Sequence, residues 1–255
     1  MGSGTARKTC KKCWNPRCKT RQTQTDCGKS VVNNLGRNST RPSPPLTLVP
    51  RYPSMDQSIE LLECETCYAG FFHLNRYRLR HRLFAGGMSP IIVRERLERL
   101  EAASVLLYDP DQEALVLIEQ FRIGALESGS RAWLWEIIGG LIEAGETPEA
   151  VAHRESWEEA GCVLSALEKI GVFYVSPGTT SERIHLYCGR VDSRRASGIH
   201  GLSGEGEDIR VVVLPWQEAM SALFTRIDST SALVAIQWLA LNREVLQAKW
   251  RGVSS

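Results

Sequence analysis

Three glutamates within one helical turn constrain this chain more than any other feature of its sequence. Residues 140–161 read GLIEAGETPEAVAHRESWEEAG, and Glu155, Glu158 and Glu159 fall near the end of the helix that this segment predicts. Like charges at i,i+4 spacing repel one another, and negative charge at the C-terminal end of a helix opposes the helix dipole. Because the arrangement is unfavourable by itself, it indicates that a positive group lies beside it.

The ends of this helix are well marked in the sequence. Thr147 suits the N-cap, Pro148 suits the first helical position, and Gly161 suits a left-handed stop. These signals predict a helix from about 148 to 160. Glu155 and Glu159 then share one face, so their carboxylates project from a single rigid element.

Most acidic runs on helices are solvated faces, and this run taken alone would be interpreted in that way. The residues around it favour a binding site. Gly139 and Gly140 precede the helix and allow a close approach of the backbone to a ligand, while Arg154 is available to pair with Glu146.

Seven positions in a 23-residue window fit the pattern G-x5-E-x7-R-E-U-x-E-E-x-G-U, where U is a bulky aliphatic residue. They are Gly140, Glu146, Arg154, Glu155, Glu158, Glu159 and Gly161. The pattern resembles the Nudix box, although Ser156 and Cys162 stand where aliphatic residues are usual. The resemblance implies that the helix binds divalent metal and that the reaction is hydrolysis of a nucleoside diphosphate linked to another moiety.

Charge is distributed unevenly along the 255 residues. Net charge is +2, but residues 1–54 contain 11 Lys and Arg against Asp26 alone, whereas the remainder contains 20 against 28. The first 54 residues have few apolar runs, so we predict a basic disordered tail. No apolar stretch approaches the roughly 18 residues that span a membrane, and the tail has no secretory h-region, so cytoplasmic localisation is the default expectation.

The tail also contains the spacing C-x2-C-x4-C-x8-C, formed by Cys10, Cys13, Cys18 and Cys27. One zinc ion is one interpretation, but the spacing fits no common zinc module well, and unpaired cysteines in a basic tail are the favoured alternative. Two other interpretations of the tail stay open. One is a nucleic-acid-binding arm, which we regard as less favoured, and the other is an upstream extension with Met55 as the working start. The remaining cysteines read as reduced structural thiols: Cys64, Cys67, Cys162 and Cys188.

Beyond the tail, the pattern alternates between strands and helices. Apolar and polar side chains alternate from Ile59 to about Arg82, and residues 55–99 are predicted to form a small antiparallel β domain that packs on something else. Residues 100–255 contain ASVLLYD, ALVLIEQFRI, AWLWEII, EKIGVFYVS, IHLYCGRV and IRVVVL as strands, with helical spacing at 148–160, 215–226 and 231–249. This order predicts a mixed α/β fold with helices on a central sheet.

The likeness extends beyond the box. GFFHLNRYRLRHRLFAGGMS, LIEQFRI, SPGTTSERIHLYCGRVD and IDSTSALVAIQWL resemble the ADP-ribose pyrophosphatase (ADP-sugar diphosphatase) branch of the Nudix family over residues 56–248. This resemblance implies an α/β/α sandwich with a mixed sheet, ADP-ribose as substrate, AMP and ribose 5-phosphate as products, and Mg²⁺ as cofactor with Mn²⁺ as a substitute. It also implies a homodimer in which residues 56–99 pack or exchange across a two-fold axis, so that Phe71 serves the partner's pocket.

The same resemblance assigns roles to individual residues. The implied metal ligands are the carbonyl of Gly139 and the carboxylates of Glu155, Glu159 and Glu207. The implied general base is Glu205 in the SGEGED loop. Support for the metal ligands falls to Glu146, Arg154 and Glu158. Substrate binding falls to Phe71, Phe72, Arg99, Arg122, Leu141, Ser176, Pro177, Gly178 and Glu182.

The sequence leaves substrate choice open. The box is equally compatible with NADH, GDP-mannose or another nucleoside diphosphate derivative. A non-catalytic module that senses a nucleotide is the alternative from another class. Such modules usually lack box glutamates, and the presence of all of them here favours an enzyme.

Overall fold

The computed structural model describes residues 58–202, 204 and 206–251. Several predictions lie outside these residues and stay predictions. They concern the disorder of the tail 1–54, Met55 as the working start, zinc binding by Cys10, Cys13, Cys18 and Cys27, and the role of Glu205.

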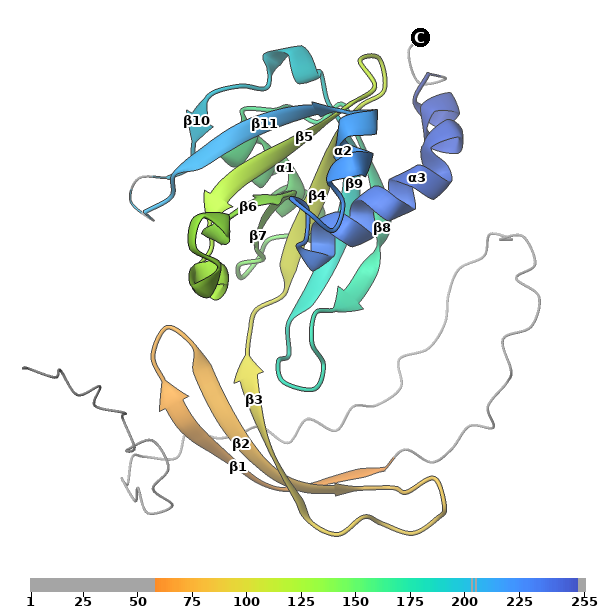
Figure 1. Ribbon diagram of the computed structural model, residues 1–255. Helices are drawn as coiled ribbons and strands as arrows, with labels where there is room; N and C mark the ends of the chain where they lie inside the picture. The colour runs from red at the N-terminus through yellow and green to blue at the C-terminus, as the bar shows by residue number, and fades with distance from the viewer. Residues whose placement is uncertain (1–57, 203, 205, 252–255) are drawn as a thin grey trace, which may run out of the picture. The chain divides into compact units, whose positions relative to one another are not determined.

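The first strands form a separate antiparallel sheet in the order β1-β2-β3, drawn in orange and yellow in Figure 1. Their bounds are β1 Ile59–Ala69, β2 His73–His81 and β3 Ile92–Glu98. Opposite charges face each other across β1 and β2, where Glu60 pairs with Arg80 and Glu63 with Arg78. The predicted N-terminal antiparallel sheet is therefore confirmed.

The second sheet has eight strands in the order β10-β11-β5-β4-β9-β8, with β6 paired to β5 and β7 paired to β4. The pairing of β4 with β9 is parallel and the others are antiparallel, so the sheet is mixed. The strands are β4 Ala102–Asp109, β5 Ala114–Phe121, β6 Trp133–Glu136, β7 Ile138–Leu141, β8 Ala166–Tyr174, β9 Arg183–Arg190, β10 Ile199–His200 and β11 Ile209–Pro215.

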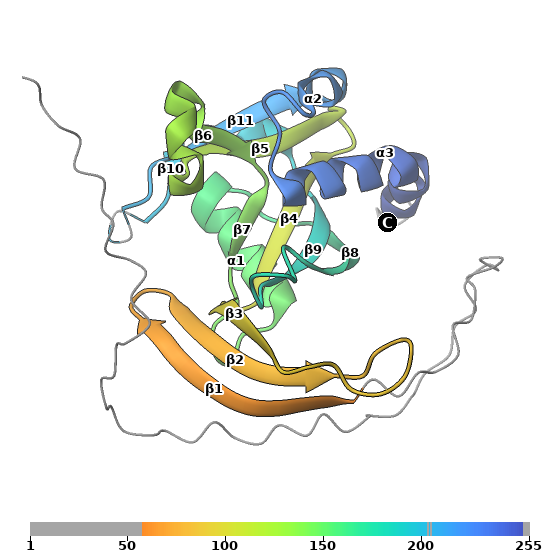
Figure 2. The ribbon, with the colours of Figure 1, turned by 60° about the horizontal axis from the view of Figure 1, so that its bottom comes forward.

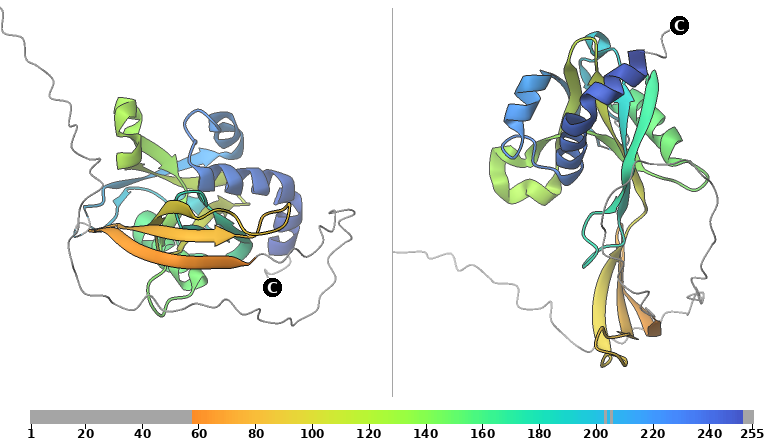
Figure 3. Two further views of the ribbon diagram at one scale, coloured as in Figure 1. Left: turned by 90° about the horizontal axis from the view of Figure 1, so that it is seen from below. Right: turned by 90° about the vertical axis from the view of Figure 1, so that its right-hand side faces the viewer.

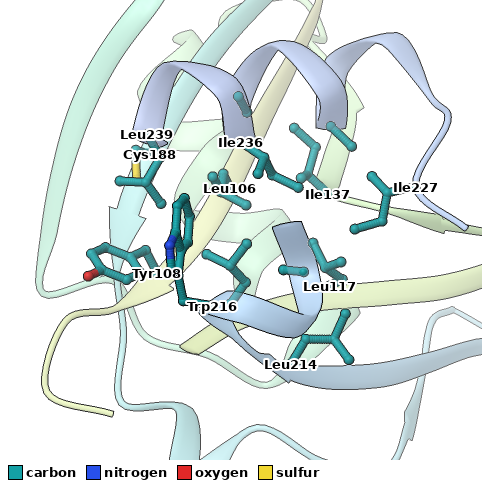
Figure 4. Close-up of a cluster of buried hydrophobic side chains, with 14 of the residues drawn as sticks. Leu106, Tyr108, Leu117, Ile137, Cys188, Leu214, Trp216, Ile227, Ile236 and Leu239 are labelled. Atoms are coloured by element: carbon teal, nitrogen blue, oxygen red, sulfur yellow. The ribbon is translucent and has the colours of Figure 1, made fainter. Parts of the chain in front are cut away.

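Helices cover both faces of this sheet, which Figures 2 and 3 show from several sides. Side chains alternate along β4, so Leu106 and Tyr108 join the core beneath α2 (Trp216–Ala222) and α3 (Thr230–Arg251). Figure 4 shows this cluster around Leu106, Tyr108 and Trp216. Val105 and Leu107 point to the other face, in the core beneath α1 (Pro148–Ala160). The predicted α/β/α sandwich is confirmed.

The α1 helix begins and ends where the sequence predicts. The Thr147 hydroxyl accepts a hydrogen bond from the Ala150 amide at 3.2 Å, and Gly161 takes the left-handed conformation with φ of 62°. In the described part of the chain, no helix is long and apolar enough to span a membrane.

Two predicted elements differ from the structure. The run AWLWEII contributes to two strands, because β6, which ends at Glu136, pairs with β5, whereas β7, which begins at Ile138, pairs with β4. The helix predicted at 215–226 ends at Ala222, since the Ala222 carbonyl accepts bonds from the turn that follows and Phe224 has a positive φ of 60°.

Candidate active site

One cavity of about 800 Å³ brings together many of the predicted site residues. Its walls come from the junction after β3, from β4, from the segment that follows β5, from β6, β7 and α1, and from the segment that precedes β11. The predicted residues that line it are Phe71, Arg99, Arg122, Gly139, Leu141, Arg154, Glu155, Glu158, Glu182 and Glu207.

Glu159 lies just beneath the cavity wall, with only 3% of its surface exposed. Its Oε2 atom accepts a hydrogen bond from the Gly139 amide at 3.0 Å. Burial is the main cause that raises the pKa of Glu159 to about 8; the charges of Glu155 and Glu207 add to this rise, while the Gly139 amide and Arg122 oppose it. Burial likewise raises the pKa of Glu155. Burial therefore disfavours the charged form of both carboxylates, and a bound cation would offset this effect.

Gly140 leaves room for Glu155. A Cβ atom at position 140 would lie 1.7 Å from the Glu155 Oε1 atom, so any side chain there would displace the carboxylate. Glu207 is held from the other side, since its Oε2 atom accepts a bond from the Leu202 amide at 3.0 Å. These glutamate oxygens are the hard ligands that Mg²⁺ and similar cations prefer, so the donor set fits a divalent metal.

Within residues 58–202, 204 and 206–251, no three acidic, histidine or cysteine side chains are gathered closely enough to form a metal site as they stand. The hydrogen bonds explain this. Glu155 is bonded to Arg154, Glu159 to Gly139 and Glu207 to Leu202, so each carboxylate is turned toward a donor of the protein.

Arg154 connects three glutamates. Its guanidinium donates to Glu146 at 3.0 Å and 3.2 Å, to Glu155 at 2.8 Å and to Glu158 at 3.0 Å. The bond to Glu146 is the main reason that the pKa of Arg154 is raised. Arg154 thus provides the charge compensation that the α1 carboxylates lack elsewhere.

Arg99 occupies the junction between β3 and β4. Its guanidinium lies 4.9 Å from the centre of the Phe72 ring and 3.7 Å from a Glu182 oxygen. Phe71 contacts Phe72 edge-on, with 4.9 Å between the ring centres, and has 87% of its surface exposed. A cation, a carboxylate and an open aromatic ring therefore meet at this end of the cavity.

The predicted residues Ser176, Pro177 and Gly178 are exposed and do not line the cavity. They belong to a turn in which the Ser176 carbonyl accepts bonds from the Thr179 and Thr180 amides. This turn is fixed to β3, because the Leu97 amide donates to the Thr179 carbonyl at 2.9 Å.

Residues 98–237 match the family model described as NUDIX domain. This chain belongs to the Nudix family. The cavity is accordingly built around the Nudix box, with α1 as the box helix, and Nudix ADP-ribose pyrophosphatases depend on a divalent metal.

Similar Nudix proteins extend the match beyond the box. The chain is 46% identical to the ADP-ribose pyrophosphatase of Haemophilus influenzae over 199 residues, which cover 76% of this chain and 92% of that protein. It is 45% identical to the ADP-ribose pyrophosphatase of Escherichia coli K12 over 193 residues, covering 75% and 92%. It is 29% identical to the GDP-mannose pyrophosphatase of Yersinia pestis over 191 residues, covering 74% and 94%.

Among solved structures, one described as an ADP compounds hydrolase has the same fold. It superposes with a TM-score of 0.57 at 21% identity, over 76% of this chain and 96% of that chain.

The sequence prediction did not include Glu136, which lines the same cavity and pairs with Arg122 at 2.6 Å. Three serines of the lining, Ser104, Ser229 and Ser231, were also not predicted. A signal for Glu136 was present, since it is the one charged residue in the apolar run AWLWEII.

Proposed function

We propose that this Nudix protein hydrolyses the diphosphate of ADP-ribose, with Mg²⁺ as cofactor, to give AMP and ribose 5-phosphate. The observation that carries the proposal is one cavity whose lining includes the box carboxylates Glu155 and Glu158 together with Arg99 and Arg122. The names of the relatives at 46% and 45% identity support the choice of substrate.

Glu155, Glu159, Glu207 and the Gly139 carbonyl would hold the metal, for which Mn²⁺ is a substitute. When bound, the cation neutralises diphosphate charge and lowers the pKa of coordinated water. Arg154 keeps Glu155 and Glu158 in place, and the burial of Glu159 fixes its carboxylate against the backbone of β7.

Recognition of the substrate is assigned to the other walls. Arg99 and Arg122 contact phosphate or ribose, because guanidinium groups bind phosphate oxygens with paired hydrogen bonds. Phe71 and Phe72 stack on adenine, and Glu182 accepts a hydrogen bond from a ribose hydroxyl. Leu141 lines the same cavity. Contacts from Ser176, Pro177 and Gly178, which lie outside that lining, stay a prediction of the resemblance.

Glu205 stays the proposed general base. It removes a proton from the attacking water, whose oxygen forms the new bond to phosphorus as the bridging P–O bond breaks. A carboxylate suits this role, since it accepts a proton from a water molecule within hydrogen-bond reach.

A homodimer is the proposed assembly, and cytoplasm is the proposed location. Large apolar side chains of the first sheet are exposed, including Ile59 at 71%, Leu61 at 54% and Val93 at 50%. Apolar groups on one small sheet favour burial against a second copy of the chain.

Comparative hydrolysis assays test this proposal. ADP-ribose, GDP-mannose and NADH are each incubated with the protein and an alkaline phosphatase, with and without Mg²⁺, and released phosphate is measured. We expect Mg²⁺-dependent release that is fastest from ADP-ribose. GDP-mannose is the second candidate, because of the relatives at 29% identity, and faster release from it would overturn the assigned substrate. Release from none of them would favour the non-catalytic module.

A further inference from the structure

Arg122 and Glu136 form a charged pair in the cavity, and the proposed function gives a role to Arg122 but none to Glu136. Arg122 follows β5, Glu136 ends β6, and both side chains line the cavity. The Arg122 Nε donates to the Glu136 Oε2 atom at 2.6 Å. The Glu136 side chain is only 16% exposed whereas that of Arg122 is 49% exposed. The Glu136 carboxylate is thus largely buried in the cavity wall, whereas the Arg122 guanidinium is more exposed.

The backbone at Arg122 is already fixed. The β5–β6 register places Phe121 opposite Trp133, and the Arg122 amide donates to the Ala132 carbonyl at 2.8 Å, which closes the neck of this hairpin. A fixed backbone does not place a guanidinium, because several rotatable bonds separate the two. In the part of the chain that the structure describes, Glu136 is the one residue that hydrogen-bonds to this guanidinium.

The choice of nitrogen matters for the chemistry. A guanidinium has five N–H donors in a planar fork, and the bond to Glu136 uses the one at Nε. The two terminal nitrogens keep their donors, and a pair of such donors matches two oxygens of a phosphate group. An arginine held at Nε is therefore presented to an anion in one orientation.

We propose that Glu136 is a positioning residue, which holds the Arg122 guanidinium so that its terminal nitrogens meet the substrate diphosphate. This inference rests on the proposed function. The opposite effect is also physically reasonable: Glu136 is an anion in an anion-binding cavity, and if it only competed for Arg122, its removal would strengthen substrate binding. Removal of Glu136 therefore weakens substrate binding if it positions Arg122 and strengthens substrate binding if it only competes for Arg122.

A double-mutant cycle separates them. Steady-state hydrolysis of ADP-ribose is measured at saturating Mg²⁺ for Glu136→Ala, Arg122→Ala, the double variant and the wild type. We expect Glu136→Ala to lower kcat/KM by about tenfold to a hundredfold, mostly through a higher KM, because a misplaced binding group weakens the hold on the diphosphate. The double variant should be no worse than Arg122→Ala alone.

Two further variants serve as controls. Glu136→Gln keeps an oxygen that accepts the hydrogen bond from the Arg122 Nε, so it should recover most of the kcat/KM that Glu136→Ala loses. Glu168→Ala removes a carboxylate paired with Lys249 outside the cavity and should leave kcat and KM unchanged. Additive losses in the cycle, or a lower KM in Glu136→Ala, would overturn the positioning role while leaving the proposed function intact. A wild type that does not hydrolyse ADP-ribose would overturn both.

Discussion

Gly140 is the residue whose replacement tests the position of Glu155 most simply. Alanine at this position would place its Cβ within 1.7 Å of the Glu155 Oε1 atom, so the carboxylate must rotate away. We expect Gly140→Ala to lower kcat and to raise the Mg²⁺ concentration for half-maximal activity, with little change in melting temperature, because a flexible side chain yields more easily than the fold.

Gly171→Ala is the matched control, since a Cβ at position 171 meets no atom within 4 Å. It should behave as the wild type. A Gly140→Ala protein with normal kcat and normal Mg²⁺ dependence would show that Glu155 is not needed where the structure places it.

Glu205 and Glu207 stand two residues apart, yet their predicted roles differ. Glu205→Gln removes the base and should lower kcat by roughly 10²–10⁴-fold with a normal Mg²⁺ requirement. Glu207→Gln removes a metal ligand, so added Mg²⁺ should recover part of its lost rate. The measurement is a Mg²⁺ titration of both variants at saturating ADP-ribose. Rescue of Glu205→Gln instead would mean that the two roles are reversed.

Individual site residues could be predicted from the sequence where the residue type was unusual for its position. Glu155 and Glu159 stood out because local helix energetics disfavour them. Glu136 stood out only as the one charge in an apolar run, and its role could not be predicted from that, because its partner Arg122 is fourteen positions away and the pairing depends on the β5–β6 register.

Among the elements, α1 carries the box carboxylates, and its N-cap contributes to its stability. Thr147→Ala removes the acceptor for the Ala150 amide and should lower the free energy of unfolding by about 1 kcal/mol in a urea titration. Thr147→Ser keeps a hydroxyl and should stay close to the wild type. Equal stability of the alanine variant would contradict the capping role.

The same element was predicted to the residue, since caps and periodicity are local signals. The division of AWLWEII into β6 and β7 was not predicted, because it depends on which neighbour each part of the run pairs with. An apolar run shows that a segment is buried, but it does not show where the chain leaves one strand for another.

For the whole molecule, the predicted exchange of residues 56–99 is the main question. Within one chain Phe71 lines the cavity of that same chain, whereas the resemblance implies that it serves the partner. If the exchange holds, mixing Phe71→Ala chains with Glu159→Gln chains should restore activity in a fraction of the sites, because each mixed dimer contains one site with both residues intact. Recovery is measured after the two proteins are unfolded and refolded together. No recovery, with dimers present by size-exclusion chromatography, would mean that Phe71 acts within its own chain.

The central claim is that the carboxylates of α1 support Mg²⁺-dependent hydrolysis of ADP-ribose. The most direct measurement is the initial rate of AMP release from ADP-ribose by the wild type and by Glu159→Gln, across a Mg²⁺ titration that begins in excess chelator. We predict no release without metal, saturable activation of the wild type, and a rate lower by on the order of a hundredfold or more in a folded Glu159→Gln protein. Near-normal AMP release by Glu159→Gln, or release by the wild type that is independent of Mg²⁺, would contradict the account.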